Sequence, residues 1–244
     1  MIKVHDIHLS FKKPVLRGVS LEVPHECIYA VIGPGAAGKS VLLKTIAGLL
    51  TPDTGQVWID GEEVTFHDEL KLAELRKKIG YLFQNYALFD KSVGDNIAFP
   101  LRRLFGNIGE DEIKERVAER LMRMSLPGFE DRNPNSLSGG QKKRIGVARA
   151  TIMRAPYILY DEPTAGLDPV TSQRICNLIR DEAREQRSTV IVVSSDIQRL
   201  LSIADRVGMM LHGQLIFDGT VDEAFASANP YVHQFIRGET EGPL

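Results

Sequence analysis

Hydrophobic positions in the first third of the chain follow the patterns of β-strands. Apolar and polar residues alternate over residues 19–23, which is typical of a strand with one buried face. Residues 27–33, CIYAVIG, are apolar almost without interruption and predict a strand covered on both faces. Within residues 55–64, Asp60-Gly61 separates two short strand-like runs and predicts a hairpin, because the tight turn needs positive φ at both central residues.

From about residue 68 to residue 154 the pattern changes to that of helices. The clearest helical segment is 111–124, DEIKERVAERLMRM. Its apolar face is formed by Ile113, Val117, Leu121 and Met124. Opposite charges one helical turn apart are expected to support the helix on its solvated face, in the pairs Glu112–Arg116 and Glu119–Arg123.

The last third of the chain alternates strands with helices. Residues 157–162 and 189–195 are candidates for buried strands, and the helical pattern of 170–186 lies between them. A strand, a helix and a second strand in this order predict a parallel sheet, and therefore an α/β fold. A second hairpin is expected at 208–219, with a short helical tail after it.

The composition is that of an ordinary globular protein. Apolar residues make up 43% of the 244 positions, charged residues make up 25%, and the net charge is −2. This balance gives no sign of a nucleic-acid surface. Cys27 and Cys176 are far apart and are expected to be buried, reduced thiols. No run approaches the ~18 apolar residues of a membrane helix, so we expect a soluble chain that needs separate spanning subunits for any work at a membrane.

A phosphate-binding loop is predicted at residues 33–40, GPGAAGKS, between a buried strand and a helix. Its glycines let backbone N–H groups point at phosphate oxygens, and the helix N-terminus adds partial positive charge. Lys39 can reach the β- and γ-phosphates, and the Ser40 hydroxyl can bind Mg²⁺. The residues expected to contact the nucleotide here are Gly33, Pro34, Gly35, Ala36, Ala37, Gly38, Lys39, Ser40 and Val41.

Two carboxylates end the strand at 157–162. Asp161 and Glu162 are adjacent, and the turn of the chain after a strand can bring both toward one phosphate site. Asp161 suits the Mg²⁺ shell, and Glu162 suits the orientation and deprotonation of an attacking water.

A second phosphate site is predicted within residues 135–150, NSLSGGQKKRIGVARA. Ser138 is a plausible N-cap, and the two glycines after it permit close approach of the backbone to an anion at the start of the helix. The residues expected to bind phosphate here are Ser138, Gly139, Gly140 and Gln141.

Residues 137–141, Leu-Ser-Gly-Gly-Gln, are similar to the signature of the ATP-binding cassette (ABC) family, and the resemblance covers essentially all 244 residues. It implies ATP and Mg²⁺ as ligands, and a dimer in which two chains hold two ATP molecules head-to-tail. By resemblance, Gln84 links Mg²⁺ and the attacking water, Asp168 lies in a loop that crosses the dimer interface, and Phe11 stacks on adenine. Tyrosine is more usual at position 11, and a plain core role for Phe11 is the alternative.

The resemblance also implies an architecture, an ABC-type P-loop ATPase with a mostly parallel core sheet, an antiparallel β subdomain and an inserted helical subdomain. The core and the β subdomain are expected to comprise 1–84 and 155–228. The helical subdomain with the signature is expected at 85–154, and a C-terminal tail at 229–244.

Within the family, the subunit of a transporter is the expected class. Members that act in DNA repair carry a long coiled coil, and members that act in translation usually fuse two cassettes in one chain. Neither feature fits a chain of 244 residues. The signature motif nearly excludes a kinase-like phosphate-loop enzyme. Residues 85–104 and 230–244 look like the ATPase subunits of Mla-type phospholipid transporters. That likeness implies a permease contacting residues 88–104, MCE-domain and STAS-domain partners, and a place at the cytoplasmic face of a bacterial inner membrane. ATPases for amino-acid transport or lipoprotein release remain the alternative.

One catalytic position departs from the family. The family's histidine that contacts the γ-phosphate and the catalytic glutamate is expected near residue 195, before an aspartate, and this chain has Ser195. Serine is shorter and never cationic, so it cannot bridge phosphate and Glu162 as an imidazole does. Either the chain is naturally a slow ATPase, or the serine was introduced to trap the ATP-bound dimer. Both explanations predict retained ATP binding and dimerisation with slow turnover.

The tail carries apolar residues. Tyr231, Phe235 and Ile236 suggest that 229–244 packs against a partner chain or against its own sheet.

Overall fold

A six-stranded sheet forms the centre of the protein in a computed structural model that describes all residues 1–244. Its order is β10-β9-β3-β8-β7-β6, and all neighbouring strands are parallel except the pair β9 and β10. The strands are β3 (Ile28–Ile32), β6 (Ile79–Leu82), β7 (Tyr157–Asp161), β8 (Thr189–Val193), β9 (Arg206–Leu211) and β10 (Gln214–Thr220). Every residue of β3, β7 and β8 is buried, as their continuous apolar runs predict.

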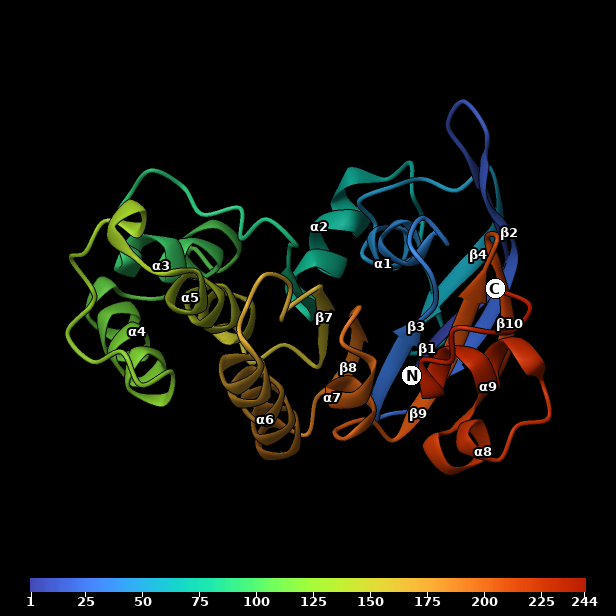
Figure 1. Cartoon of the computed structure of the whole chain (residues 1–244). Helices are drawn as coiled ribbons and strands as arrows, with labels where there is room; N and C mark the ends of the chain where they lie inside the picture. Colours follow the sequence, from blue (N-terminus) through green and yellow to red (C-terminus); the bar gives the residue numbers. More distant parts are fainter.

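A second, antiparallel sheet has the order β2-β1-β4-β5. Its strands are β1 (Ile2–Ser10), β2 (Pro14–Val23), β4 (Thr54–Ile59) and β5 (Glu62–Glu63). The turn between β4 and β5 has φ of 55° at Asp60 and 80° at Gly61, so the predicted hairpin is confirmed. Figure 1 shows this sheet at the end of the molecule that also holds the C-terminal helices.

The helices α3, α4 and α5 gather at the opposite end of the molecule (Figure 1). The helices are α1 (Lys39–Ile46), α2 (Glu69–Lys78), α3 (Val93–Leu104), α4 (Glu110–Arg123), the short 3₁₀ helix η1 (Pro134–Ser136), α5 (Gly139–Thr151), α6 (Pro169–Gln186), α7 (Ile197–Leu201), α8 (Val221–Phe225) and α9 (Pro230–Arg237). The predicted apolar face of α4 is buried at all four positions. The predicted mixed α/β architecture is confirmed, whereas the subdomain boundaries stay predictions.

Alternate residues of the central strands enter two different cores. Tyr29 and Val31 of β3 lie in a cluster of 27 buried residues with α1, α2 and the antiparallel sheet. Ile28 and Ala30 lie in a cluster of 36 residues that continues into α3, α4, α5 and the C-terminal helices. The central sheet is therefore covered on both faces, which fixes the positions of the loops at its carboxyl edge.

The expectation of helices throughout 68–154 is wrong at β6, a strand at the edge of the central sheet. Gly80 explains how this strand fits there, because a Cβ atom on Gly80 would lie 2.0 Å from the Ala150 carbonyl oxygen of α5. A four-residue strand between two helices is too short to show its own period.

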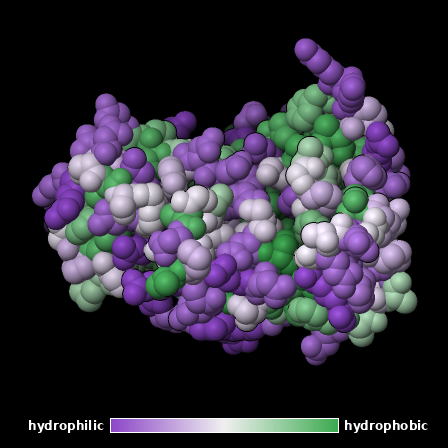
Figure 2. Space-filling model, viewed as in Figure 1, coloured by the Kyte–Doolittle hydropathy of each residue, from purple (hydrophilic) through white to green (hydrophobic).

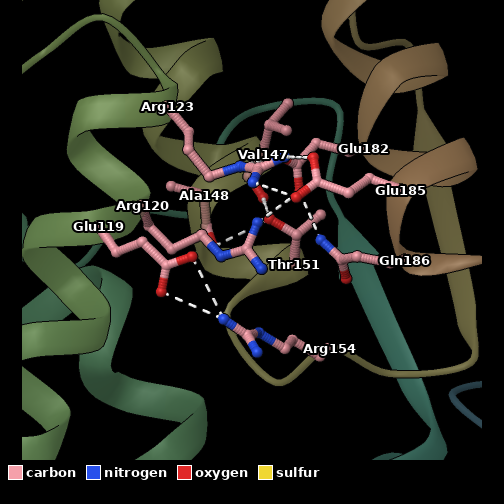
Figure 3. A network of polar contacts seen from close by, with 10 residues as sticks. All are labelled: Glu119, Arg120, Arg123, Val147, Ala148, Thr151, Arg154, Glu182, Glu185 and Gln186. Carbon is pink, nitrogen blue, oxygen red and sulfur yellow. Dashed lines mark hydrogen bonds and ion pairs between the residues drawn. The ribbon is translucent and has the colours of Figure 1, made fainter.

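The expected Glu119–Arg123 pair is also wrong, although Glu112 and Arg116 do pair. Arg123 instead pairs with Glu182 and Glu185 of α6, and Arg120 also pairs with Glu182 (Figure 3). The side chains of Arg120 and Glu182 are each only 3% exposed, so this face of α4 is an interface with α6 rather than a solvated face. Spacing along one helix cannot reveal a partner on another helix.

The C-terminal helix α9 packs on its own chain. Val232 and Ile236 belong to the larger core, and Gln198 of α7 donates to the Ile236 carbonyl at 2.9 Å. None of the helices combines the length and the apolar character needed to cross a membrane. Figure 2 shows hydrophilic residues over most of the face viewed, with hydrophobic residues in separate groups.

Candidate active site

The predicted phosphate-binding loop joins β3 to α1 at the carboxyl edge of the central sheet. Gly33 has a φ of 140°, and a Cβ atom there would lie 2.1 Å from the Met210 carbonyl oxygen, so the loop needs glycine at this position. Gly38, with a φ of 97°, precedes α1 and provides no side-chain cap. The first N–H groups of α1 are therefore free to bind an anion.

Lys39 lies folded over this loop. Its Nζ donates to the carbonyl oxygens of Gly33 and Pro34, both at 2.8 Å. Burial lowers the pKa of Lys39, and the negative charges of Glu162 and Asp161 act in the opposite direction. Phosphate oxygens can replace the two carbonyls as acceptors, with a larger gain because they carry charge.

Ser40 and Asp161 meet directly behind the loop. The Ser40 hydroxyl donates to Asp161 Oδ1 at 2.7 Å, and Asp161 is 2% exposed. A hydroxyl and a carboxylate are the hard oxygen ligands that suit Mg²⁺, which usually completes its shell with water and substrate phosphates. The residues present therefore fit a magnesium ion, and the two predicted ligands Ser40 and Asp161 lie in contact, while their role in metal binding stays a prediction.

Glu162 turns away from its strand with a φ of 52°. Its N–H donates to the Val193 carbonyl at 2.8 Å. Its Oε2 accepts two hydrogen bonds from Ser195, one from the backbone N–H and one from the hydroxyl, both at 3.0 Å. Residue 195, where the family's histidine is expected, therefore contacts Glu162. The neighbouring Ser194 is buried and bonded to Thr164, so it is a structural residue.

The signature residues lie at the exposed start of α5. Ser138 accepts from the Gln141 N–H at 3.3 Å, and Gln141 Oε1 accepts from the Ser138 N–H at 2.9 Å. This reciprocal pair is a capping box, so the predicted N-cap is confirmed. The hydrogen bonds of Ser138 are confined to this helix end, and Ser138 and Gly139 are exposed.

The structure identifies Lys143 as a residue that the sequence analysis missed. Its Nζ donates to the carbonyl oxygens of Gln84 at 2.9 Å and Glu162 at 2.7 Å. Lys143 is 1% exposed, and burial lowers its pKa to about 8. A usable signal was its helical spacing, because Lys143, Val147 and Ala150 share one face of α5 and the latter two are buried.

Two further predicted residues lie apart from this group. Asp168 caps α6 by accepting from the N–H groups of Val170 and Thr171, and these bonds to Thr171 and Val170 lower its pKa. Phe11 lies between β1 and β2 and is 62% exposed, so the alternative of a plain core aromatic is wrong. The interface role of Asp168 and the adenine-stacking role of Phe11 stay predictions.

Known proteins resemble this chain over most of its length. A family model described as "ABC transporter" matches residues 16–165. An energy-coupling factor transporter ATP-binding protein of Methanothermobacter thermautotrophicus is 39% identical over 93% of this chain and 73% of its own. The chloroplastic protein TRIGALACTOSYLDIACYLGLYCEROL 3 of Arabidopsis thaliana is 37% identical over 100% and 75%. The solved dimeric structure of MJ0796, a bacterial ABC transporter cassette, aligns with a TM-score of 0.85 and 30% identity over 91% and 99%.

Proposed function

Because the chain belongs to the ABC transporter family, we propose that it is the ATP-binding and ATP-hydrolysing subunit of a membrane transporter. One observation carries this proposal. Four polar side chains converge beside the phosphate-binding loop, at the carboxyl ends of β7 and β8 and the start of α1, namely Ser40, Asp161, Glu162 and Ser195. Three separate segments of the chain thus bring together two candidate Mg²⁺ ligands, Ser40 and Asp161, and a carboxylate, Glu162, that is oriented by Ser195.

ABC ATPases bind ATP with Mg²⁺. We expect Ser40, Asp161 and Gln84 to hold the ion, which when bound neutralises charge on the phosphates. Lys39 and the N–H groups of the loop bind the phosphate oxygens. Glu162 orients the attacking water and accepts its proton, with one carboxylate oxygen held by Ser195.

A second copy of this chain is the expected partner across the nucleotide. The capped, exposed start of α5 offers backbone N–H groups to the γ-phosphate bound by another chain. Each chain has one phosphate-binding loop and one such helix start. A two-fold head-to-tail pair therefore forms two equal nucleotide sites, each made of the loop of one chain and the helix start of the other. The dimeric relative of known structure supports this arrangement.

The permease is expected to dock beside the glutamine loop, which is the segment 83–92 between β6 and α3 that contains Gln84. Phe89 and Phe99 are each 42% exposed and lie at a cavity of about 560 Å³. Apolar side chains dominate its lining, and Arg76 and Arg103 also contribute to it. A short helix with an apolar face and an acidic end is the expected occupant, in a permease that places this chain at the cytoplasmic face of an inner membrane.

Phospholipid is the proposed substrate class. The likeness of residues 85–104 and 230–244 to Mla-type ATPases supports it. A relative whose name contains a galactolipid, which has no phosphate group, supports only the broader class of membrane lipids. MCE-domain and STAS-domain proteins are further proposed partners. An importer of an amino acid is the second candidate, because two relatives are named methionine import ATP-binding proteins.

Nucleotide-dependent dimerisation tests the core of the proposal. The parent chain and Glu162→Gln are compared by size-exclusion chromatography with light scattering, with Mg²⁺ and either ATP or ADP. We expect dimers of Glu162→Gln with ATP and not with ADP, and loss of hydrolysis in that variant. Monomers under all conditions, without ATP binding, would overturn the proposal.

Substrate class needs a separate experiment. The chain is purified with the products of neighbouring genes, and bound small molecules are identified by mass spectrometry. Enriched phospholipid supports the lipid proposal, whereas an enriched amino acid supports the second candidate.

A further inference from the structure

We propose that Lys143 is a positioning residue that holds the catalytic glutamate and the glutamine loop in one fixed arrangement for ATP hydrolysis. The inference rests on the proposed roles of Glu162 and Gln84. Lys143 itself contacts neither the phosphates nor the attacking water in this assignment. It acts through the backbone of the two residues that do.

The contacts of Lys143 are directed and protected from water. Its ammonium donates to the carbonyl oxygens of Gln84 at 2.9 Å and Glu162 at 2.7 Å, and it lies 4.8 Å from the centre of the Tyr86 ring. These are charge-assisted bonds, which are stronger than bonds between neutral groups. Because Lys143 is 1% exposed, water has little access to its ammonium group, which strengthens the two bonds that it donates.

Both segments that Lys143 holds have backbone conformations that are unfavourable for residues with side chains. Glu162 has a φ of 52°, and Tyr86 and Ala87 in the glutamine loop have φ of 59° and 48°. Such conformations persist only where surrounding contacts determine them. The Glu162 carbonyl accepts the bond from Lys143 and one longer bond, at 3.3 Å, from the Ala165 N–H. Lys143 is therefore the stronger hold on this carbonyl.

A second cation of α5 provides a natural comparison. Arg149 donates to the carbonyl oxygens of Tyr86 and Ala87, at 2.6 Å and 2.7 Å, and so holds the glutamine loop alone. Lys143 holds this loop and also the catalytic glutamate. Since α5 starts at the signature residues, Lys143 connects the helix that meets the partner chain to the group that activates water.

The test separates chemistry from binding. Single-turnover ATP hydrolysis, the Kd for ATP with Mg²⁺ and the thermal melting temperature are measured for Lys143→Met and Lys143→Gln.

A misplacement of about 1 Å at a catalytic group costs up to about 100-fold in rate, so we expect Lys143→Met to hydrolyse ATP about 10- to 100-fold more slowly. We expect its Kd to change less than about threefold, because the phosphate-binding loop is untouched. The amide of Lys143→Gln can still donate to a carbonyl and is expected to recover part of the rate.

Three further variants make the result decisive. Lys114→Met, the same change on an exposed lysine of α4, is expected to match the parent chain. Arg149→Met loosens the glutamine loop only and is expected to be slowed less than Lys143→Met. Glu162→Gln checks the proposed role of the glutamate.

Four outcomes overturn the inference. They are a rate of Lys143→Met within threefold of the parent, an equal loss in Arg149→Met, a parallel loss of ATP binding and melting temperature, and unchanged hydrolysis in Glu162→Gln. The last outcome also removes the proposed role of Glu162, whereas the first three leave it intact. If Lys143→Met does not fold, Lys143→Gln is judged by the same rate and Kd criteria.

Discussion

At the scale of single residues, the contact between Ser195 and Glu162 bears most directly on the proposed ATPase activity. Both the N–H and the hydroxyl of Ser195 bind the same carboxylate oxygen, Oε2, which orients the glutamate. A serine has no ring nitrogen to reach onward to a phosphate and does not take up a proton near neutral pH. We therefore expect the site to keep the orientation of its proposed base, Glu162, but to lack an imidazole between this carboxylate and the γ-phosphate.

Restoring a histidine is expected to speed hydrolysis. Ser195→His should raise the steady-state ATPase rate at least about tenfold, because a positioned acid or base typically contributes about 10²- to 10⁴-fold. ATP binding and dimerisation should be unchanged. The variant should also gain a pH dependence near the pKa of histidine that the parent lacks. Equal rates for the two proteins across pH 6–8 would refute this reading of position 195.

The sequence predicted most of this site, since its residues belong to short motifs. Ser40, Asp161 and Glu162 each follow or precede a strong strand or helix pattern, so their meeting at one sheet edge could be expected. Lys143 could not be expected in the same way. A lysine in a charged run resembles a solvated residue. Its helical spacing from Val147 and Ala150 indicates a buried face, but its contacts with the glutamine loop and Glu162 come from tertiary packing.

At the scale of elements, ion pairs connect α4 with α6. Arg120 and Glu182 form a buried pair, and the half-buried Arg123 joins Glu182 to the exposed Glu185. Glu119 pairs with Arg154 nearby (Figure 3). Asp168 caps the start of α6, so this helix connects the predicted interface loop to the ion pairs with α4. Helix periodicity predicted α4 correctly and the partners of its arginines wrongly, because α6 lies 59 to 62 residues away in the sequence.

Breaking this network on one side is expected to be costly. Glu182→Leu leaves two arginines without their buried partner, and loss of one member of a buried pair typically costs about 3–5 kcal/mol. Adding Arg120→Met to that variant should recover part of the loss, since the uncompensated buried charge is gone. Urea unfolding of the parent chain, the single variant and the double variant measures their free energies of unfolding. A double variant less stable than Glu182→Leu would contradict the prediction.

Acid sensitivity is expected at α3. Hydrogen bonds from Arg102 lower the pKa of Asp95 and of Glu110. A carboxylate with a lowered folded-state pKa stabilises the fold above its unfolded-state pKa, and this contribution disappears as pH falls through the folded value.

Arg102→Met therefore should lower the melting temperature slightly at pH 7, and the difference from the parent should shrink as pH falls below the ordinary carboxyl pKa values of about 4. Both carboxylates are largely exposed, so the effect is expected to be small and reduced by salt. A difference that grows toward low pH would contradict the assignment of these pairs.

At the scale of the whole molecule, the central sheet and its two cores could be predicted well. The continuous apolar runs of β3, β7 and β8 identify buried parallel strands, and turn residues mark both hairpins. The edge strand β6 escaped prediction because it is short and lies between helices. Its place in the sheet depends on the close contact between Gly80 and α5, which is a tertiary contact that sequence periodicity does not reveal.

The C-terminal tail is part of the folded chain at this scale. Deleting 229–244 removes Val232 and Ile236 from the larger core, and burial of such a side chain is worth about 1.5–3 kcal/mol. We expect a lower melting temperature of the isolated chain, and weaker dimers as a consequence. The check is differential scanning calorimetry beside sedimentation of the ATP-bound protein. Unchanged melting together with unchanged sedimentation would show that the tail is dispensable.

The close approach of β6 and α5 also has an evolutionary consequence. Even a methyl group on Gly80 would lie 2.0 Å from the Ala150 carbonyl oxygen, which is backbone and cannot move aside as a side chain can. Every relative that inherits this packing is therefore expected to inherit glycine at this position, although it binds nothing. If glycine is invariant here among homologues, the cause is the packing of the fold and not ligand binding. If the residue varies, we expect α5 to pack differently against β6 in those homologues.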